Sequence, residues 1–532
     1  MAGLGLHEQG RPVALHGCTS MNSTASAKLL WLLLLVVFWA FYGLTGRDAW
    51  KPDEALALAP ILDAVPDLAR TWAAPAPLYA WAAALLARLG APWLNLQDGA
   101  RLASGGFTLA SMGFTALAAR RLFGPGFGAI LVLALLGCFG LMLRMHAMAP
   151  ETAQLAAWSA LLAGVAYGRD ASRVGGVLIG LSLAALFLGL RGVPDLVAGM
   201  ALLLLPLVSP QWRLPDYFRA LRLGLGLAAA IAAVSLLMLH GDGHLDAWLC
   251  WHGPQRLTSG MGSFRAYSEL PWFAWPLWPL ALVALWHEHR RLGRAQELHF
   301  PLLALLAAML ATLGPSWTRD GALLPLLPPL ALLAVHGVDR MKRGAAQAFY
   351  WFGVLTFLFF IFAFWTYFSA LEWGMPARLA AHMVALTPSH RPGLVPVRSQ
   401  FLAFTASALW LLAIPLFPRA KIRPVLVWAS GMVLVWTLLI ALFRPWLEAG
   451  WGYKPLIADM SRHLPAGACL KIDTDPAMRV MLRYHLHAKS NANCPWLLVD
   501  ADRKVAMGGK PRWEGVRPRQ NKTRYRLYYL AR

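Results

Sequence analysis

Residues 29–54 read LLWLLLLVVFWAFYGLTGRDAWKPDE, an uninterrupted apolar run that changes abruptly into a charged segment. About 20 apolar residues, with about 17 as a minimum, cross the hydrocarbon core of a bilayer. Residues 29–46 therefore predict a membrane-spanning helix, which we interpret as a retained signal anchor because the run lacks a convincing small-residue cleavage site. The charged segment is then the start of the first loop on the other side of the membrane.

The same apolar pattern recurs along the chain, which has 532 residues, is 58% hydrophobic and is only 14% charged. Such a composition leaves too little polar surface for a soluble fold. We predict an all-α polytopic membrane protein with about 13 spans. The predicted spans are residues 29–46, 101–119, 126–146, 152–168, 174–190, 194–210, 222–240, 272–287, 299–315, 322–338, 348–369, 400–418 and 424–443. Residues 78–89 are apolar but too short to cross, and we predict an interfacial helix there.

The net charge of +22 comes from short basic loops and not from a nucleic-acid-binding motif. With residues 78–89 at the interface, six basic clusters fall on one side, which is the positive-inside pattern. They are Arg120/Arg121, Arg169/Arg173, Arg213/Arg219, Arg290/Arg291/Arg294, Arg340/Lys342/Arg343 and Arg419/Lys421/Arg423. This pattern predicts a bacterial inner-membrane protein with a cytoplasmic N-terminus. The long outward loops, residues 47–100, 241–271, 370–399 and everything after about 444, must then carry any chemistry.

Three regions follow from these patterns. Residues 1–28 are a polar leader that we expect to be disordered, and whether the natural start is Met1 or Met21 stays open. Residues 29–443 form the membrane domain, with a candidate catalytic loop at 47–100. Residues 444–532 are predicted as a small periplasmic α/β domain, with strands near 469–472, 496–499 and 525–530 and a helix at 477–486. Cys469 and Cys494 in this domain either form a disulfide or stay free.

The first outer loop carries adjacent carboxylates, Asp53 and Glu54, beside the cationic Arg47 and Lys51. Neighbouring acids and cations shift one another's pKa values and suit general-base chemistry next to a phosphate. Lys51 is then a candidate ligand of the donor phosphate. However, Pro52-Asp53-Glu54 is also typical of a helix start, because proline tolerates the first turn and acids favour the positive end of the helix dipole. Both interpretations stay open.

Three further charged residues fall at outer ends of predicted spans. Glu151 follows Pro150 and either begins a helix or joins Asp53 in a site. Arg191 either reaches lipid headgroups or neutralises a leaving phosphate. Arg319 precedes Asp320 and is either half of a surface pair or a second phosphate ligand. No Cys/His spacing predicts a metal site.

Several stretches together carry a resemblance to a known family. They are the first-loop acids, the Pro77-Leu78-Tyr79 step into the interfacial helix, the sequence AARRLFG at residues 118–124 and the sequence LPLLPPLA at residues 324–331. In this order, over about residues 29–340, the chain resembles the GT-C glycosyltransferases of family 39. That group includes protein O-mannosyltransferases and the bacterial transferases that add aminoarabinose to lipid A.

The resemblance implies a GT-C fold and an inverting transfer of a sugar from a polyprenyl-phosphate donor. Asp53 would be the catalytic acid/base residue, and Glu151 would occupy the second-loop carboxylate position. Arg191 would stand where relatives often carry Lys, facing the donor phosphate. The stretch Ala74–Pro77 differs from the Glu-Lys-Pro-Pro of the aminoarabinose branch, so the acceptor stays open among lipid A, a glycan and a protein. The resemblance implies no required cofactor, leaves divalent-metal dependence open, and we expect a monomer surrounded by membrane lipids.

Two alternative functions remain. A transporter or flippase of lipid-linked sugars would carry ionisable groups near the bilayer midplane, within interrupted helices. The acids and cations of this chain collect instead at the outer ends of spans, which favours an enzyme. A non-catalytic envelope scaffold that displays the C-terminal domain is the second alternative.

Overall fold

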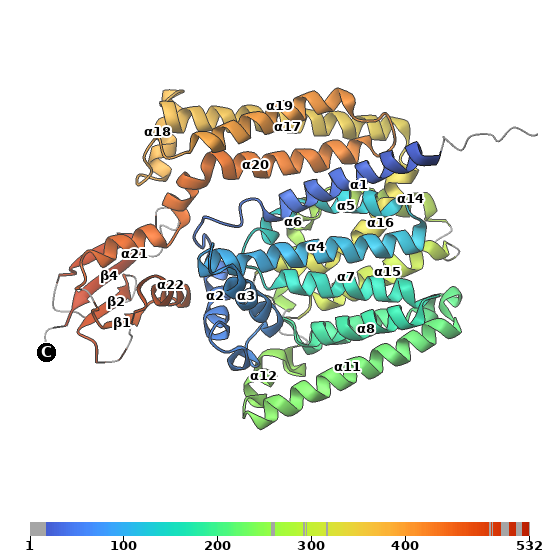
Figure 1. The fold of residues 1–532 in the computed structure, drawn as a ribbon, viewed down its shortest axis with the longest axis horizontal. Coiled ribbons are helices and arrows are strands. Elements are labelled where there is room, and N and C mark those ends of the chain that lie inside the picture. Colours follow the sequence, from blue (N-terminus) through green and yellow to red (C-terminus); the bar gives the residue numbers. More distant parts are fainter. Residues whose placement is uncertain are drawn as a thin grey trace, which may run out of the picture.

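The computed structural model describes residues 18–256, 261–290, 293, 295–314, 316, 318–465, 467–488, 491, 493–501, 510–517 and 524–530. Long helices lie side by side in a bundle, and a small sheet lies beyond one end of it (Figure 1). The bundle is built from α1 (Cys18–Phe41), α4 (Leu96–Phe123), α5 (Phe127–Leu136), α6 (Phe139–Met145), α7 (Glu151–Gly168), α8 (Ser172–Phe187), α9 (Val193–Leu203), α10 (Leu205–Val208), α11 (Pro215–Gly241), α14 (Leu277–Glu288), α15 (Gln296–Ala311), α16 (Leu327–Arg340), α17 (Arg343–Trp373), α19 (Val397–Leu416) and α20 (Arg423–Trp451).

Shorter elements connect these helices. The first loop contains α2 (Pro52–Ala64), η1 (Leu68–Thr71) and α3 (Pro77–Gly90), so the predicted interfacial helix at residues 78–89 coincides with α3. The other connections contain η2 (Pro210–Trp212), α12 (Leu245–His252), η3 (Pro254–Arg256), η4 (Met261–Ser268), α13 (Leu270–Phe273), η5 (Gly321–Leu326) and α18 (Ala377–Leu386).

Every predicted span coincides with one helix or with consecutive short helices. Among the described residues, six helices are long and apolar enough to cross a membrane, and the bent pair α5–α6 would make a seventh. A polytopic helical membrane protein is therefore confirmed, whereas the total of about 13 spans stays a prediction. Most of the proposed disordered leader, residues 1–17, lies outside the described residues, and α1 already begins at Cys18.

The break between α5 and α6 directs the chain toward the first loop. The two helices meet at an angle of 69°, around Gly137 and Cys138. The indole Nε1 of Trp428 in α20 donates to the carbonyl oxygen of Gly137 (2.9 Å). A Cβ at position 137 would lie 2.7 Å from the Trp428 ring, so only glycine leaves room for this ring. Because of this bend, Arg144 near the end of α6 lies close to α2, where it contacts Asp53.

Ion pairs connect several of the basic loops at the opposite end of the bundle from the first loop. Arg121 pairs with Asp170, and Arg340 pairs with Glu288. Lys421 lies 3.2 Å from Asp339. The predicted basic clusters that these residues represent therefore lie together, as the positive-inside pattern requires. Arg291 and Arg294 lie outside the described residues, and the side of the membrane stays a prediction.

The C-terminal domain follows α20, which runs past the predicted boundary at residue 444 to Trp451. It contains α21 (Lys454–Ser461), β1 (Leu470–Asp473), α22 (Pro476–Leu486), β2 (Trp496–Asp500), β3 (Trp513–Val516) and β4 (Arg524–Tyr529). The strand order is β1-β2-β4-β3, with β1 parallel to β2 and the other pairs antiparallel. The predicted strands and helix are confirmed, and β3 is additional.

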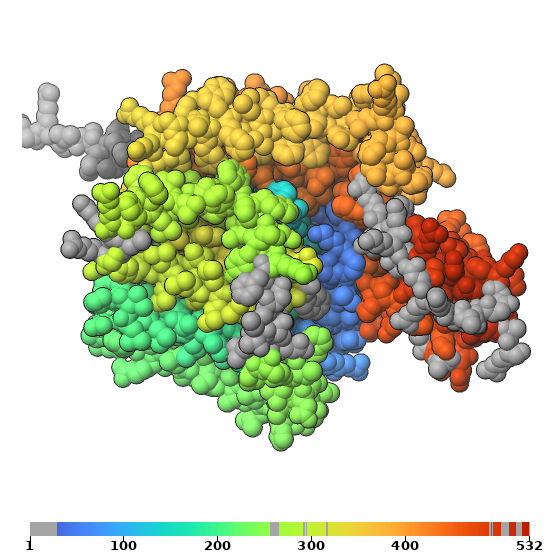
Figure 2. Space-filling model, turned by 180° about the vertical axis from the view of Figure 1, so that it is seen from behind, coloured from blue at the N-terminus to red at the C-terminus, as the bar shows by residue number. Residues whose placement is uncertain are grey.

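The C-terminal domain and the first loop share one apolar core. Leu58 and Ile61 of α2 belong to the same cluster of buried side chains as Leu482 of α22 and Leu498 of β2. In Figure 2 the blue residues of the first loop lie between the green and yellow helices and the red C-terminal residues. The first loop is therefore fixed from both sides, by the bundle and by the sheet.

Cys469 and Cys494 form a disulfide, with Cα atoms 5.1 Å apart and a separation of 25 positions in the sequence. This settles the alternative that the sequence left open. Closing a loop of this length removes chain entropy from the unfolded state worth roughly 3 kcal/mol.

We expect Cys494→Ser to lower the temperature at which the C-terminal domain unfolds. The measurement heats the protein in steps and finds the temperature at which trypsin begins to degrade the fragment that contains this domain. Cys250→Ser, a change at an exposed cysteine outside this domain, is the control, and equal heat resistance of both variants would contradict the prediction.

Candidate functional site

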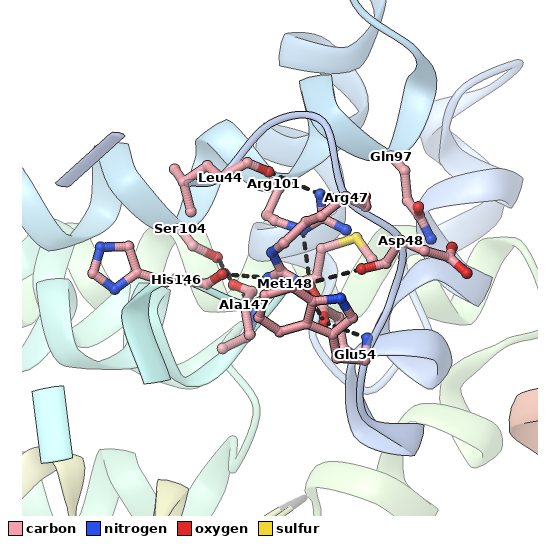
Figure 3. A network of polar contacts seen from close by, with 12 residues as sticks. Leu44, Arg47, Asp48, Glu54, Gln97, Arg101, Ser104, His146, Ala147 and Met148 are labelled. Atoms are coloured by element: carbon pink, nitrogen blue, oxygen red, sulfur yellow. Dashed lines mark hydrogen bonds and ion pairs between the residues drawn. The ribbon is translucent and has the colours of Figure 1, made fainter. Parts of the chain in front are cut away.

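Glu54 stands at the centre of a buried polar network at the start of α2 (Figure 3). Its Oε1 atom accepts hydrogen bonds from Arg47 (2.8 Å), Arg101 (2.8 Å) and the backbone N–H of Met148 (3.2 Å). Its Oε2 atom accepts from Arg47 (3.0 Å) and from the backbone N–H of Trp50 (3.1 Å). Five donors from three segments thus occupy this carboxylate, which fixes the first loop on α4 and on the turn before α7.

The charge state of Glu54 follows from these partners. Burial alone would raise its pKa, but the charges of Arg47 and Arg101 and the hydrogen bonds outweigh burial and lower the pKa to about 2. Glu54 is therefore a permanent anion at neutral pH. A carboxylate in this condition holds structure in place and is a poor proton acceptor.

Asp53 points to a different partner, Arg144 at the end of α6. The Nη1 atom of Arg144 donates to Oδ2 of Asp53 (2.7 Å), and its Nη2 atom donates to Oε1 of Glu151 (3.3 Å). Its Nε atom lies 3.8 Å from Oδ2 of Asp320. One guanidinium thus gathers carboxylates from three segments that are far apart in the sequence. Arg144 and Glu151 are buried, whereas the side chains of Asp53 and Asp320 are 17% and 22% exposed.

Glu151 begins α7 beneath the loop before α16. Its Oε1 atom also accepts from the hydroxyl of Thr318 (3.1 Å), and its Oε2 atom has no hydrogen-bond partner among the described residues. A Cβ at Gly321 would lie 2.4 Å from Oε1, so the loop can approach this closely only with glycine there. A fully buried carboxylate oxygen without a protein donor is uncommon, and such atoms are typical of sites that bind water or a ligand.

Arg191 is fully buried against the same loop. Its Nη1 and Nη2 atoms donate to the backbone carbonyls of Ala311 (2.6 Å) and Ala322 (3.2 Å). Its Nε atom has no hydrogen-bond partner among the described residues. Its nearest carboxylate is that of Asp195, at 4.0 Å. Arg191 therefore carries a positive charge that is only loosely compensated, behind the segment that also contacts Glu151.

The remaining two predicted phosphate ligands lie at the surface. Lys51 precedes α2 and Arg319 precedes Asp320, and both side chains are exposed. Within the described ranges neither forms an ion pair. Among the predicted residues, the structure thus brings Asp53 and Glu151 together on Arg144, places Glu54 in the adjacent network and Arg191 on the adjoining loop, and leaves Lys51 and Arg319 free to approach a ligand.

Two important residues were not predicted from the sequence. Arg144 lies inside an apolar stretch at the outer end of a predicted span, and Arg101 lies at the start of another. A charged residue inside a span is itself a signal, because burying it requires a partner. That signal was present for both arginines, but their partners lie in other segments and are not visible in the local sequence.

A second feature ties the first loop to the C-terminal domain. The carboxylate of Asp48 accepts hydrogen bonds from the backbone N–H groups of Tyr453 (2.8 Å) and Lys454 (2.6 Å), and from Nε2 of His485 (3.2 Å). Arg517 donates to the carbonyl oxygen of Trp50 (3.0 Å). Between these segments lies a cavity of about 1050 Å³ whose walls include Gln97, Glu448, Lys454 and His485. Asp53 is not among its lining residues.

Asp48 makes the contact between the first loop and the C-terminal domain depend on pH. Burial would raise its pKa, but the hydrogen bond and charge of His485 and the N–H of Lys454 lower the pKa below its usual value. This stabilisation is therefore present above about pH 4, the usual aspartate pKa, and is lost as the pH falls through the lower folded value.

We expect Asp48→Asn to weaken this docking by about 1.5–3 kcal/mol, the usual contribution of hydrogen bonds to a charged group. Limited proteolysis in detergent should then release the C-terminal domain faster than in the parent protein at pH 7. Asp67→Asn is the matched control, because Asp67 is an exposed first-loop carboxylate that pairs with Arg70. Identical digestion rates for the two variants would show that Asp48 does not hold the domain.

No protein-family model matches the chain, and no curated protein matches its sequence. Its structure is similar to two crystal structures of ArnT from Cupriavidus metallidurans. The structure bound to undecaprenyl phosphate has a TM-score of 0.62 and 16% identity, and the alignment covers 94% of this chain and 98% of that chain. The structure in the apo state has a TM-score of 0.59 and 16% identity, covering 95% and 98%. The GT-C fold expected from the sequence is thereby confirmed.

Among the described residues, no group of three or more His, Cys, Asp and Glu side chains is arranged to hold a metal ion. The Asp53–Arg144–Glu151 group has a different composition, with one guanidinium serving as the common counter-ion of its acids.

Proposed function

We propose that the chain is an inverting glycosyltransferase that moves a sugar from a polyprenyl-phosphate donor to an acceptor at the periplasmic face of the bacterial inner membrane. The observation that carries the proposal is the convergence of Asp53, Glu151 and Asp320 on Arg144, with Asp53 partly exposed. The shared fold with a protein crystallised with undecaprenyl phosphate supports this donor class.

Asp53 is the proposed general base. Its Oδ2 atom is held by Arg144, which leaves Oδ1 to accept a proton from an incoming hydroxyl. The acceptor oxygen then forms a bond to the anomeric carbon from the face opposite the leaving group. The bond from that carbon to the phosphate oxygen breaks, and the polyprenyl phosphate departs with the electron pair. If the acceptor is itself a phosphate, no proton has to move, and Asp53 orients the acceptor instead.

The developing negative charge on the leaving phosphate needs nearby cations. Arg191 has an Nε atom without a partner and a carboxylate only at 4.0 Å. Lys51 and Arg319 are exposed and form no ion pair among the described residues, so both are available to a ligand. We assign these three residues to the donor phosphate. Glu54 is a positioning residue, because its oxygens are already occupied by five donors.

The direct test uses the purified protein in proteoliposomes that contain a radiolabelled polyprenyl-phosphate sugar. Transfer of label to lipid A, to an exported protein or to a glycan, with release of the polyprenyl phosphate, is the expected result. EDTA in a parallel reaction measures dependence on a divalent metal. Mass spectrometry of these three acceptor classes from a deletion strain identifies the natural acceptor.

The same preparation separates the alternatives. Movement of the intact labelled lipid across the bilayer without any product would establish a transporter and overturn the proposal. A scaffold would keep its function after Asp53→Asn, since this substitution changes no surface of the C-terminal domain. Deleting residues 454–532 is a weaker discriminator, because the first loop and the C-terminal domain share one apolar core.

A further inference from the structure

A small polar pocket lies at the outer ends of α1, α19 and α20, apart from the residues of the candidate site. Its volume is about 350 Å³. Two arginines, Arg398 and Arg444, line it from α19 and α20, together with the hydroxyl-bearing Tyr42, Thr45 and Ser399. The remaining lining residues are Phe41, Gly43, Leu402 and Ile440.

The two guanidiniums in this pocket are uncompensated. Among the described residues, neither Arg398 nor Arg444 forms an ion pair, and no carboxylate lines the pocket. The arginines of the candidate site differ, because Arg47, Arg101 and Arg144 each pair with at least one acid. The side-chain hydroxyls of Thr45 and Ser399 likewise form no hydrogen bond within the described part of the chain. Two positive charges and two free hydroxyls therefore converge on one small volume.

The backbone of the adjoining turn is shaped by Arg444 and Ile440. Gly43 and Gly46 both have positive φ, 85° and 73°. A Cβ at Gly46 would lie 3.0 Å from Nη1 of Arg444, and a Cβ at Gly43 would lie 2.9 Å from Ile440. The turn thus packs directly on the wall of the pocket, which places the pocket at the level where α1 leaves the membrane. Arg444 is half-buried there and Arg398 is exposed.

The pocket opens beside an apolar helix face. In α19, Val397, Phe401 and Phe404 are 79%, 70% and 63% exposed. Such a face on a helix of a membrane protein contacts lipid chains. A ligand of this pocket would therefore have a polar part that reaches the arginines and an apolar part that lies along α19.

We propose that this pocket binds the phosphate headgroup of an anionic membrane lipid. A phosphate offers several acceptor oxygens in a tetrahedral arrangement, which suits two guanidiniums and flanking hydroxyls better than a single carboxylate does. The lipid-facing surface of α19 favours a lipid over free phosphate. The site is separate from the proposed donor site, and its arginines are not those assigned to the sugar donor.

Native mass spectrometry of the purified protein in detergent tests this site. Phosphatidic acid and diacylglycerol with identical chains are offered at equal concentration. We expect one bound phosphatidic acid molecule, with at least a tenfold preference over diacylglycerol. Arg398→Gln combined with Arg444→Gln should reduce this binding about tenfold or more, and Arg444→Lys should reduce it several-fold, because lysine lacks the planar fork of arginine.

The matched control combines Arg378→Gln with Arg391→Gln, which changes two exposed arginines of the same predicted outer loop that do not line the pocket. This control should bind phosphatidic acid as the parent does. If both double variants lose phosphatidic acid binding equally, the arginines act only through the overall positive charge of the loop, and the proposed site is refuted. Displacement of the lipid by millimolar inorganic phosphate would show that the ligand is free phosphate.

The single variant Arg398→Gln keeps the test decisive if the double variant fails to fold, since Arg398 is exposed and its substitution leaves the packing intact. Unchanged binding by this variant at parental size-exclusion behaviour would overturn the proposal. Sugar transfer is measured separately, so failure of this site and failure of the proposed function give different results.

Discussion

Asp53→Asn is expected to abolish sugar transfer, with a loss of about 100- to 10,000-fold, the usual contribution of a general base. Asparagine has the size of aspartate and can still accept one hydrogen bond from Arg144 through its side-chain oxygen. It lacks the negative charge that would take a proton from the acceptor. Membrane insertion, size-exclusion behaviour and donor binding should stay close to those of the parent protein.

Asp63→Asn provides the control within the same helix. Asp63 is 46% exposed and pairs with Arg483 at the surface, and such pairs contribute about 1 kcal/mol or less. Turnover of labelled polyprenyl-phosphate sugar is compared for both variants under single-turnover conditions. Parental activity in Asp53→Asn would remove the central residue of the proposed mechanism. An equal loss of sugar transfer in Asp63→Asn would show that the substitutions disturb the folding of α2 and that the loss does not report a catalytic role of Asp53.

Glu54→Gln is expected to destabilise the protein by about 3–5 kcal/mol, the usual cost of removing one partner from a buried ion pair. Arg47 and Arg101 are both buried, and Arg47 would lose its only ion pair in the described part of the chain. Thermal unfolding in detergent, followed by scanning fluorimetry, measures the effect. Glu514→Gln is a matched control, because Glu514 also contacts two arginines, Arg524 and Arg526, but is 39% exposed.

The depressed pKa of Glu54, about 2, also fixes a pH window. The unfolded chain binds a proton to this carboxyl near pH 4.3, whereas the folded protein does so only near pH 2. The stabilisation by Glu54 is therefore complete above about pH 4.3 and is lost as the pH falls toward 2. The stability difference between the parent and Glu54→Gln should shrink over this range, and a constant difference from pH 7 to pH 2 would contradict this assignment.

The helices could be predicted well from the sequence, because the lipid environment imposes long apolar runs that are visible locally. The first-loop acids were found for a similar reason, since charges next to an apolar run stand out. The C-terminal domain was predicted except for β3, whose residues Trp513–Val516 alternate poorly, with burial of Trp513 alone in that strand.

The pairing of the charges could not be predicted. Asp53 and Glu54 are neighbours in sequence, yet they point to different arginines, Arg144 and Arg47. Their roles diverge because the chain bends between α5 and α6, at Gly137, and so brings Arg144 to one of them. This depends on the contact with Trp428, nearly 300 residues later in the chain. Local patterns contain no information on such contacts.

The shared core of the first loop and the C-terminal domain has a consequence for biosynthesis. The acids at positions 48, 53 and 54 leave the ribosome early, but Asp48 obtains its last partner only when His485 has been made. Until then the apolar faces of α2 and α3 lack the cover that α22 and the sheet provide. Activity should therefore appear only after translation is nearly complete. Chains that stop early would therefore be inserted but inert.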